Sequence, residues 1–190
     1  TRRRIGRGVL VESFVEGSWI DLRDPRQVRE AARALADVHS VAAPPDGALL
    51  RPEDPLRAQL ESCRRLFDGY RGSDLAEARV VGAVDELLAL AQRAVDAAPS
   101  TSTAERSHVL NTEAVPSHFL IDAAGRASIV DWEKPVLGEV AQDVAYFLSP
   151  TTTIWDSDVV FDAEGRTQFL DAYWEAVGGR FPRGSFDARF

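Results

Sequence analysis

Residues 108–121 read HVLNTEAVPSHFLI, and residues 129–133 read IVDWE. In both segments a polar stretch borders apolar residues, which predicts a polar loop between short strands. The loop carries a carboxylate at its centre, Glu113, and the second apolar segment ends at another, Asp131. Because adjacent strand ends of a hairpin lie side by side, we expect Glu113, His118 and Asp131 to lie close together.

A cluster of acids at strand ends is a candidate metal and acid–base site. Two other interpretations of the loop stay open at this point. In the first, the loop is a β-turn with solvated polar residues. In the second, His108, Glu113 and His118 are metal ligands, although their five-residue spacing matches no helical zinc motif.

The segments that flank the loop predict further short strands. Apolar residues at 119–121 and 127–130 surround the turn residues 122–125, which is typical of a hairpin. Residues 107–110 are compatible with a short strand, and the β-branched, apolar stretch Gly8–Val15 predicts another.

The rest of the chain is expected to be helical. Asp24 and Asp54 each precede a proline, and such a pair is typical of a helix cap followed by the first helical position. Apolar residues then recur at helical spacing, up to His39 after the first pair and up to Phe67 after the second. Further helices are expected over residues 74–97, with an inward face that includes Leu87, and over residues 141–148 and 163–177. The predicted fold class is therefore α+β, mainly helical, with a short β-hairpin beside the loop.

The composition is that of an ordinary globular protein. Hydrophobic residues make up 45% and charged residues 27%, and no apolar run approaches the roughly 18 residues of a membrane span. The net charge of −8 argues against nucleic acid as a partner, because phosphates attract a basic surface. It is compatible with a cationic small-molecule substrate. An acidic group also suits a cation, although a solvated loop is its default explanation: Asp156, Asp158, Asp162 and Glu164.

The chain has a single cysteine, Cys63, which excludes an internal disulfide and a cysteine zinc site. Cys63 falls on the apolar stripe of the second predicted helix, so we expect a buried structural thiol. A thiol without a disulfide fits a reducing, cytoplasmic setting.

The two quoted segments resemble the aminoglycoside phosphotransferase and choline kinase family. Its members carry a loop of the form H-G-D-x-x-x-x-N, then an apolar strand, then I-D-W-E or I-D-F-E. The resemblance places Glu113 on the catalytic aspartate, His118 on the magnesium-binding asparagine and Asp131 on the metal-binding aspartate. The 18 residues from Glu113 to Asp131 match the usual spacing of the family.

The resemblance extends to both sides of this core. Residues 138–148, GEVAQDVAYFL, resemble the G-D-P-x-x-D-L-A helix start of the family through Asp143. Asn111 stands in place of the loop histidine, and we expect Asn111 and Asp143 to support the loop structurally. Residues 9–17, VLVESFVEG, resemble the strand and linker between the two lobes of the family, where backbone groups meet adenine. The resemblance therefore implies a nucleotide hinge at Glu12, Ser13 and Phe14.

The implied domain organisation is the C-terminal lobe of a protein kinase-like phosphotransferase. Residues 1–17 would be the hinge strand and linker from an N-terminal lobe, and residues 18–190 the helical catalytic and substrate lobe. The only lysine, Lys134, lies beyond Asp131, and no glycine-rich loop precedes Val9. We therefore expect the ATP-cradling N-terminal lobe to be missing from these residues.

The implied function is ATP-dependent phosphoryl transfer, with Mg²⁺, to a hydroxyl of an aminoglycoside-like or related small molecule. Two departures bear on this activity. Glutamate at position 113 adds one methylene, about 1.5 Å of reach, to a base that must meet the substrate hydroxyl. Histidine at position 118 is a poor magnesium ligand, because Mg²⁺ prefers oxygen. A non-catalytic kinase-like binding module is the alternative, and we expect the isolated chain to be inactive.

Overall fold

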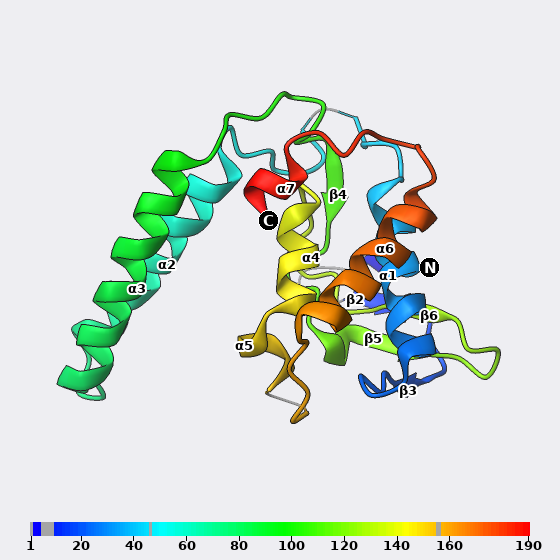
Figure 1. Cartoon of the computed structure of the whole chain (residues 1–190), viewed down its shortest axis with the longest axis horizontal. Coiled ribbons are helices and arrows are strands. Elements are labelled where there is room, and N and C mark those ends of the chain that lie inside the picture. The colour runs from blue at the N-terminus through cyan, green and yellow to red at the C-terminus, as the bar shows by residue number, and fades with distance from the viewer. Residues whose placement is uncertain (1, 5–9, 46, 155–156) are drawn as a thin grey trace.

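The computed structural model describes residues 2–4, 10–45, 47–154 and 157–190, which form three short antiparallel sheets and a larger set of helices (Figure 1). The strands are β1 (Arg2–Arg4), β2 (Leu10–Glu12), β3 (Ser18–Trp19), β4 (His108–Leu110), β5 (Phe119–Ile121), β6 (Ala127–Ile129) and β7 (Val136–Gly138). The α-helices are α1 (Pro25–His39), α2 (Pro55–Arg71), α3 (Ala78–Ala97), α4 (Ala141–Leu148), α5 (Pro150–Thr153), α6 (Ala163–Val177) and α7 (Phe186–Arg189). The predicted class, α+β and mainly helical, is confirmed.

The predicted hairpin is β5 and β6, with Leu120 opposite Ser128. At its turn the Asp122 carboxylate accepts hydrogen bonds from the backbone N–H of Ala124 and of Arg126, each at 2.9 Å. Gly125 has a φ of +79°, which glycine adopts without strain. The sequence did not indicate β3, which pairs with β5, or β7, which pairs with β4.

The predicted strand over Gly8–Val15 is shorter in the structure. Its described part is β2, which ends at Glu12 and pairs with β1. Residues 13–17 form no strand, and residues 5–9 lie outside the described ranges.

The core lies between α1, α4 and α6. The Asp24 side chain caps α1 by accepting a hydrogen bond from the Arg26 N–H at 2.9 Å, as the Asp-Pro pair predicts. The side of α1 that faces α6 consists largely of alanine and leucine, so the two helices pack closely: Ala31, Ala32, Leu35 and Ala36. Phe119, Phe147 and Phe169 fill the space beside them and are fully buried.

Helices α2 and α3 form a hairpin that stands to one side of the rest of the chain (Figure 1). Because the two helices pack mainly against each other, only a narrow stripe of each is covered. None of the residues of α3 is buried, Leu87 is 62% exposed, and Cys63 on α2 is exposed. The expectations of a buried thiol and of an inward-facing Leu87 were therefore wrong. Helix α3 also starts at Ala78 rather than at residue 74.

No helix within the described ranges is long and apolar enough to span a membrane.

Candidate active site

The polar loop after β4 is held from below by Asp143 in the first turn of α4. The Asp143 carboxylate is fully buried and accepts hydrogen bonds from the backbone N–H of Asn111 at 2.7 Å and of Thr112 at 3.0 Å. His39 Nε2 lies 3.4 Å from the same carboxylate, and His39 Nδ1 lies 2.7 Å from the Tyr173 hydroxyl. Burial, with a smaller effect of Asp143, raises the pKa of Tyr173. This buried network joins α1, α4 and α6 beneath the loop.

Asn111 connects the two halves of the candidate site. Its side-chain amide donates a hydrogen bond to the Asp131 carbonyl at 3.1 Å, and its Oδ1 accepts one from the Glu113 N–H at 3.2 Å. Thr112 (φ 71°) and Asp131 (φ 57°) are the only non-glycine residues of the described chain with positive φ. Such backbone is costly for residues other than glycine, and it concentrates at functional sites.

His118 lies between the two acids that the sequence singled out. Its Nδ1 lies 2.8 Å from the Glu113 carbonyl oxygen, and its Nε2 lies 3.5 Å from Asp131 Oδ2. A carbonyl only accepts hydrogen bonds, so Nδ1 carries a proton. The structure thus places the His118 ring between the Glu113 backbone carbonyl and the Asp131 carboxylate, while the Glu113 carboxylate lies beside Lys134.

The donor set fits magnesium poorly. Mg²⁺ prefers octahedral oxygen ligands, whereas Asp131 and His118 offer one carboxylate and one imidazole. Within the described ranges, no three or more His, Cys, Asp or Glu residues gather closely enough to hold a metal ion. The three-residue metal site with His108 is therefore wrong: His108 Nδ1 donates to the His39 carbonyl at 2.7 Å instead. Burial lowers the pKa of His108.

Glu113 lines two neighbouring hollows. The first, of about 690 Å³, is lined by Glu113, Val115, Ser117, His118, Tyr146, Thr151 and Thr152. The second, of about 720 Å³, lies between the loop and α2, and its lining includes Thr112, Glu113, Lys134, Gln142, Tyr146, Gln59, Ser62 and Arg65. Both volumes are in the range of small-molecule sites, ~300–1,000 Å³.

Tyr146 lines both hollows together with Glu113 and was missed by sequence reasoning. Burial raises the pKa of Tyr146, and the negative charge of Glu113 adds to the shift. The signal in the sequence is its position three residues after Asp143, because residues three apart share one face of a helix.

Lys134 lies at the rim of the second hollow, with its side chain 71% exposed. Its Nζ is 3.9 Å from Glu113 Oε1 and 3.8 Å from Glu133 Oε2. The single lysine of the chain therefore lies beside the carboxylate that the sequence marks as catalytic.

The acidic group near residue 158 lies elsewhere. Asp158 forms an ion pair with Arg23, and Asp162 caps α6 by accepting a hydrogen bond from the Gly165 N–H at 2.8 Å. Neither residue lines the hollows beside Glu113, and Asp156 lies outside the described residues. The predicted hinge residues do not line these hollows either. Glu12 ends β2, Ser13 and Phe14 follow it, and Phe14 is 88% exposed.

The sequence profile of the APH phosphotransferase enzyme family matches residues 2–186. The chain belongs to this phosphotransferase family. No curated protein sequence is similar enough to count as a relative. The fold of this family member is also that of solved kinase-like phosphotransferases, so the predicted family and fold are both confirmed.

Three solved structures illustrate the likeness. An ethanolamine kinase from Plasmodium vivax matches with a TM-score of 0.64 and 18% identity over 92% of this chain and 52% of its own. An aminoglycoside phosphotransferase from Alicyclobacillus acidocaldarius matches with a TM-score of 0.55 and 17% identity over 93% and 54%. A spectinomycin phosphotransferase solved with ADP and spectinomycin gives a TM-score of 0.56 and 14% identity over 84% and 50%. The chain thus spans about half the length of these structures.

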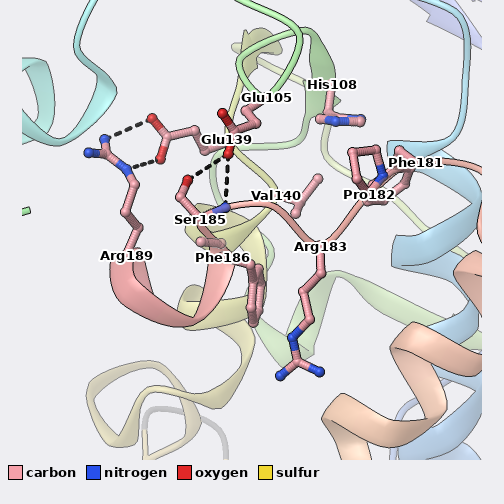
Figure 2. A pocket seen from close by; sticks show the side chains of 11 residues that line it. Glu105, His108, Glu139, Val140, Phe181, Pro182, Arg183, Ser185, Phe186 and Arg189 are labelled. Carbon is pink, nitrogen blue, oxygen red and sulfur yellow. Dashed lines mark hydrogen bonds and ion pairs between the residues drawn. The ribbon is translucent and has the colours of Figure 1, made fainter. Parts of the chain in front are cut away.

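The C-terminal segment of the chain connects the α2–α3 hairpin to Glu139, which precedes α4. Figure 2 shows Arg189 paired with Glu139, the second residue before α4, and Ser185 bonded to Glu105. Arg189 also donates to the Pro99 carbonyl at 2.6 Å, just beyond α3, and lies 3.9 Å from the Asp54 carboxylate that caps α2. The hollow among these side chains is only about 20 Å³, which is room for one water molecule. These contacts therefore stabilise the packing of the chain, and the hollow between them is too small for a ligand.

Proposed function

We propose that the full-length protein is an ATP-dependent phosphotransferase that acts on a hydroxyl of a small molecule. The observation that carries this proposal is the position of Glu113 on the boundary of two hollows of ligand size. One hollow is lined in part by His118, and the other is lined in part by residues of α2. A donor phosphate in the first and an acceptor hydroxyl in the second would meet at the Glu113 carboxylate.

The residues of the chain supply positioning and a proton acceptor. Glu113 is half exposed, so its carboxylate reaches a bound hydroxyl, orients it and accepts its proton during attack on the terminal phosphorus. Asp143 and Asn111 fix the backbone on which Glu113 stands. Tyr146 and α2 enclose the acceptor. Catalysis of phosphoryl transfer depends largely on such positioning.

The proposed domain organisation assigns residues 1–17 to a hinge and residues 18–190 to the catalytic and substrate lobe. A second lobe would cradle the ATP phosphates, and Glu12, Ser13 and Phe14 would meet the adenine. Phe14 and Trp19 support this assignment, because they leave 88% and 76% of their surface exposed beside the hinge. The match to only half of the related structures supports it as well. Without that lobe, this chain is expected not to turn over ATP.

The test is phosphate transfer from ATP by the full-length gene product to a panel of aminoglycosides, choline-like amines, sugars and amino acids. Transfer to at least one class of acceptor is expected, with at least a 100-fold loss in Glu113→Gln, the range typical of removing a general base, ~10²–10⁴. The matched control is Glu133→Gln, which removes a nearby carboxylate that is 62% exposed and is expected to retain activity. Equal activity of the two variants would remove Glu113 from the mechanism.

A non-catalytic binding module is the second candidate, and His118 is the observation that favours it. An imidazole faces Asp131 where the family pattern has an oxygen ligand. Binding of ATP by the full-length protein without transfer to any acceptor of the panel would support the module and contradict the enzyme.

A further inference from the structure

The face of α2 that lines the second hollow changes from apolar to polar along the helix. Its lining residues recur at the three- and four-residue spacing of one helix face: Pro55, Ala58, Gln59, Ser62, Arg65 and Leu66. Apolar side chains come first, an amide and a hydroxyl follow, and the guanidinium of Arg65 lies one helical turn further on. A molecule in the hollow therefore meets hydrogen-bonding groups on this side, with a positive charge at one end of the row.

Arg65 differs from the other arginines of α2 in its partners. Arg57, Arg64 and Arg71 each bind a polar side chain of α3, so they hold the helical hairpin together. Within the described ranges, the Arg65 guanidinium forms no hydrogen bond or ion pair. A guanidinium offers a planar fork of N–H donors that matches a carboxylate through two parallel hydrogen bonds. Arg65 is therefore available to an anion that enters the hollow.

The other charges at this hollow offset each other. Among the described residues, the charged members of the lining are Glu113, Lys134 and Arg65. Lys134 Nζ lies 3.9 Å from Glu113 Oε1, whereas Glu133, which is 3.8 Å from the same Nζ, does not line the hollow. The charge of Arg65 is thus left without a counter-ion at the hollow, although the chain as a whole carries −8.

A cationic acceptor would find few groups here that bind it. Proteins recognise cations through carboxylates and through the faces of aromatic rings. In the described part of the lining, Glu113 is the one carboxylate and already lies opposite Lys134, and Tyr146 is the one aromatic residue. The charge of the hollow therefore favours an anion, because the ligand meets these side chains rather than the net charge of the chain.

We propose that the acceptor bound in this hollow is a small hydroxy acid, whose carboxylate pairs with Arg65 and whose hydroxyl faces Glu113. One uncompensated positive charge matches one carboxylate, and about 720 Å³ accommodates a molecule of this class. The inference rests on the proposed function for the transfer step. In that step the hydroxyl oxygen bonds to the terminal phosphorus of ATP, the bond from this phosphorus to ADP breaks, and the hydroxyl proton passes to Glu113.

The binding test uses two sets of probes that differ chiefly in the charge of one terminal group. The sets are glycerate, glycerol and aminopropanediol, and gluconate, sorbitol and glucamine. Each probe is titrated into the isotope-labelled 190-residue chain, and NMR follows the side-chain N–H signal of Arg65, identified by its absence from Arg65→Gln. We expect the acid of at least one set to shift this signal at a concentration ~10-fold or more below that of its neutral and cationic counterparts.

Neighbouring arginines of α2 provide the matched pair of variants. Arg65→Gln is expected to weaken binding of the acid at least ~10-fold, because a charge-assisted contact is lost. Arg64→Gln removes an arginine that does not line the hollow and is expected to leave the affinity unchanged. Circular dichroism of both variants checks that the fold is retained. Equal binding of acid and neutral probe in both sets, or an unchanged acid affinity in Arg65→Gln, would overturn the assignment.

Glu113→Gln separates an anionic from a cationic acceptor. The substitution removes a negative charge from the hollow and leaves Lys134 without this partner, so the acid is expected to bind more tightly than to wild type. A cationic acceptor would instead bind more weakly. Tighter binding of glucamine or aminopropanediol than of the matching acid, in wild type, would also contradict the proposal.

The failures of the two proposals are distinguishable. Phosphate transfer by the full-length protein to a neutral or cationic acceptor, unaffected by Arg65→Gln, would sink the hydroxy acid and leave the enzyme. Binding of an acid that depends on Arg65, without transfer to any acceptor, would sink the enzyme and leave the anion site.

Discussion

The buried carboxylate of Asp143 accepts a hydrogen bond from the backbone N–H of Asn111 at 2.7 Å. A second one comes from the Thr112 N–H at 3.0 Å, so one side chain of α4 fixes the start of the loop that carries Glu113. In Asp143→Asn the charge is lost and an amide NH₂ group competes with these donors. Each charge-assisted hydrogen bond contributes about 1.5–3 kcal/mol, so we expect a loss of ~3 kcal/mol in the free energy of unfolding.

Urea denaturation measures this loss, and hydrogen exchange at the amides of Asn111 and Thr112 locates it. The control is Asp171→Asn, which changes an exposed carboxylate on α6 and is expected to stay within about 0.5 kcal/mol of wild type. Unchanged exchange at the two amides in Asp143→Asn would show that Asp143 does not hold the loop.

Arg189 and Glu139 form a buried ion pair. Loss of Arg189 alone is expected to lower the free energy of unfolding much more than replacement of both residues by apolar ones. Their side chains are 5% and 9% exposed, and Arg189 Nη2 donates to Glu139 Oε1 at 2.7 Å. Arg189→Met leaves the carboxylate buried without its partner, which costs about 3–5 kcal/mol of stability. The double variant Arg189→Met, Glu139→Leu is expected to recover most of that loss. A double-mutant cycle by urea denaturation measures the coupling, and additive losses would contradict it.

Glu105 makes stability depend on pH in the acid range. The Ser102 N–H, then the Ser185 hydroxyl and N–H, hold the pKa of Glu105 at about 2, below its ordinary 4.5. A lowered folded pKa contributes stability that is complete above about pH 4.5 and is lost as the pH falls toward 2. Glu105→Gln should therefore unfold at lower urea than wild type at pH 7, and this gap should close toward pH 2.

The matched control for Glu105 is Glu175→Gln, an exposed carboxylate on α6. Its urea midpoint is expected to follow that of wild type at every pH. A gap for Glu105→Gln that stays constant from pH 7 to the acid limit of folding would contradict the assignment.

The same substitution, glycine to alanine, is expected to have opposite effects at two helix positions. Gly178 ends α6 with a φ of +56°, where alanine costs about 1–2 kcal/mol. Gly82 lies within α3, and a Cβ there would meet no atom within 4 Å. Alanine at Gly82 is expected to stabilise by about 0.5–1 kcal/mol. Thermal unfolding of the two variants checks the signs, and shifts in the same direction would contradict the argument.

The elements with local signals were predicted well from the sequence. Asp24-Pro25 marks α1, and apolar triplets around the turn at Asp122 mark the β5–β6 hairpin. His118 and Asp131 lie near each other because they adjoin β5 and β6, which pair, whereas Glu113 follows β4, which pairs with β7 instead. These features depend on neighbours in the chain, and a sequence displays such neighbours directly.

The features that were missed depend on distant partners. Strand β7 has three residues and is defined by its pairing with β4, so no alternation of its own reveals it. Arg189 reaches Glu139 across 50 residues, and nothing in its local sequence distinguishes it from a surface arginine. Cys63 shows the converse error. Cys63 lies on the apolar stripe of α2, but α2 packs mainly against α3 alone, so part of this stripe remains exposed to solvent.

The position of the α2–α3 hairpin has a consequence for the hollow beside Glu113. It supplies the wall of the hollow beside Glu113 through Gln59, Ser62 and Arg65, yet the main core consists of other elements. Substitutions on this wall are therefore expected to change the lining of the hollow at little cost to folding. A mutational library confined to these α2 residues would vary the hollow while the main core stays intact. The hairpin is thus joined to the rest of the described chain through a few contacts, among them those of Arg189 with the Pro99 carbonyl and Asp54.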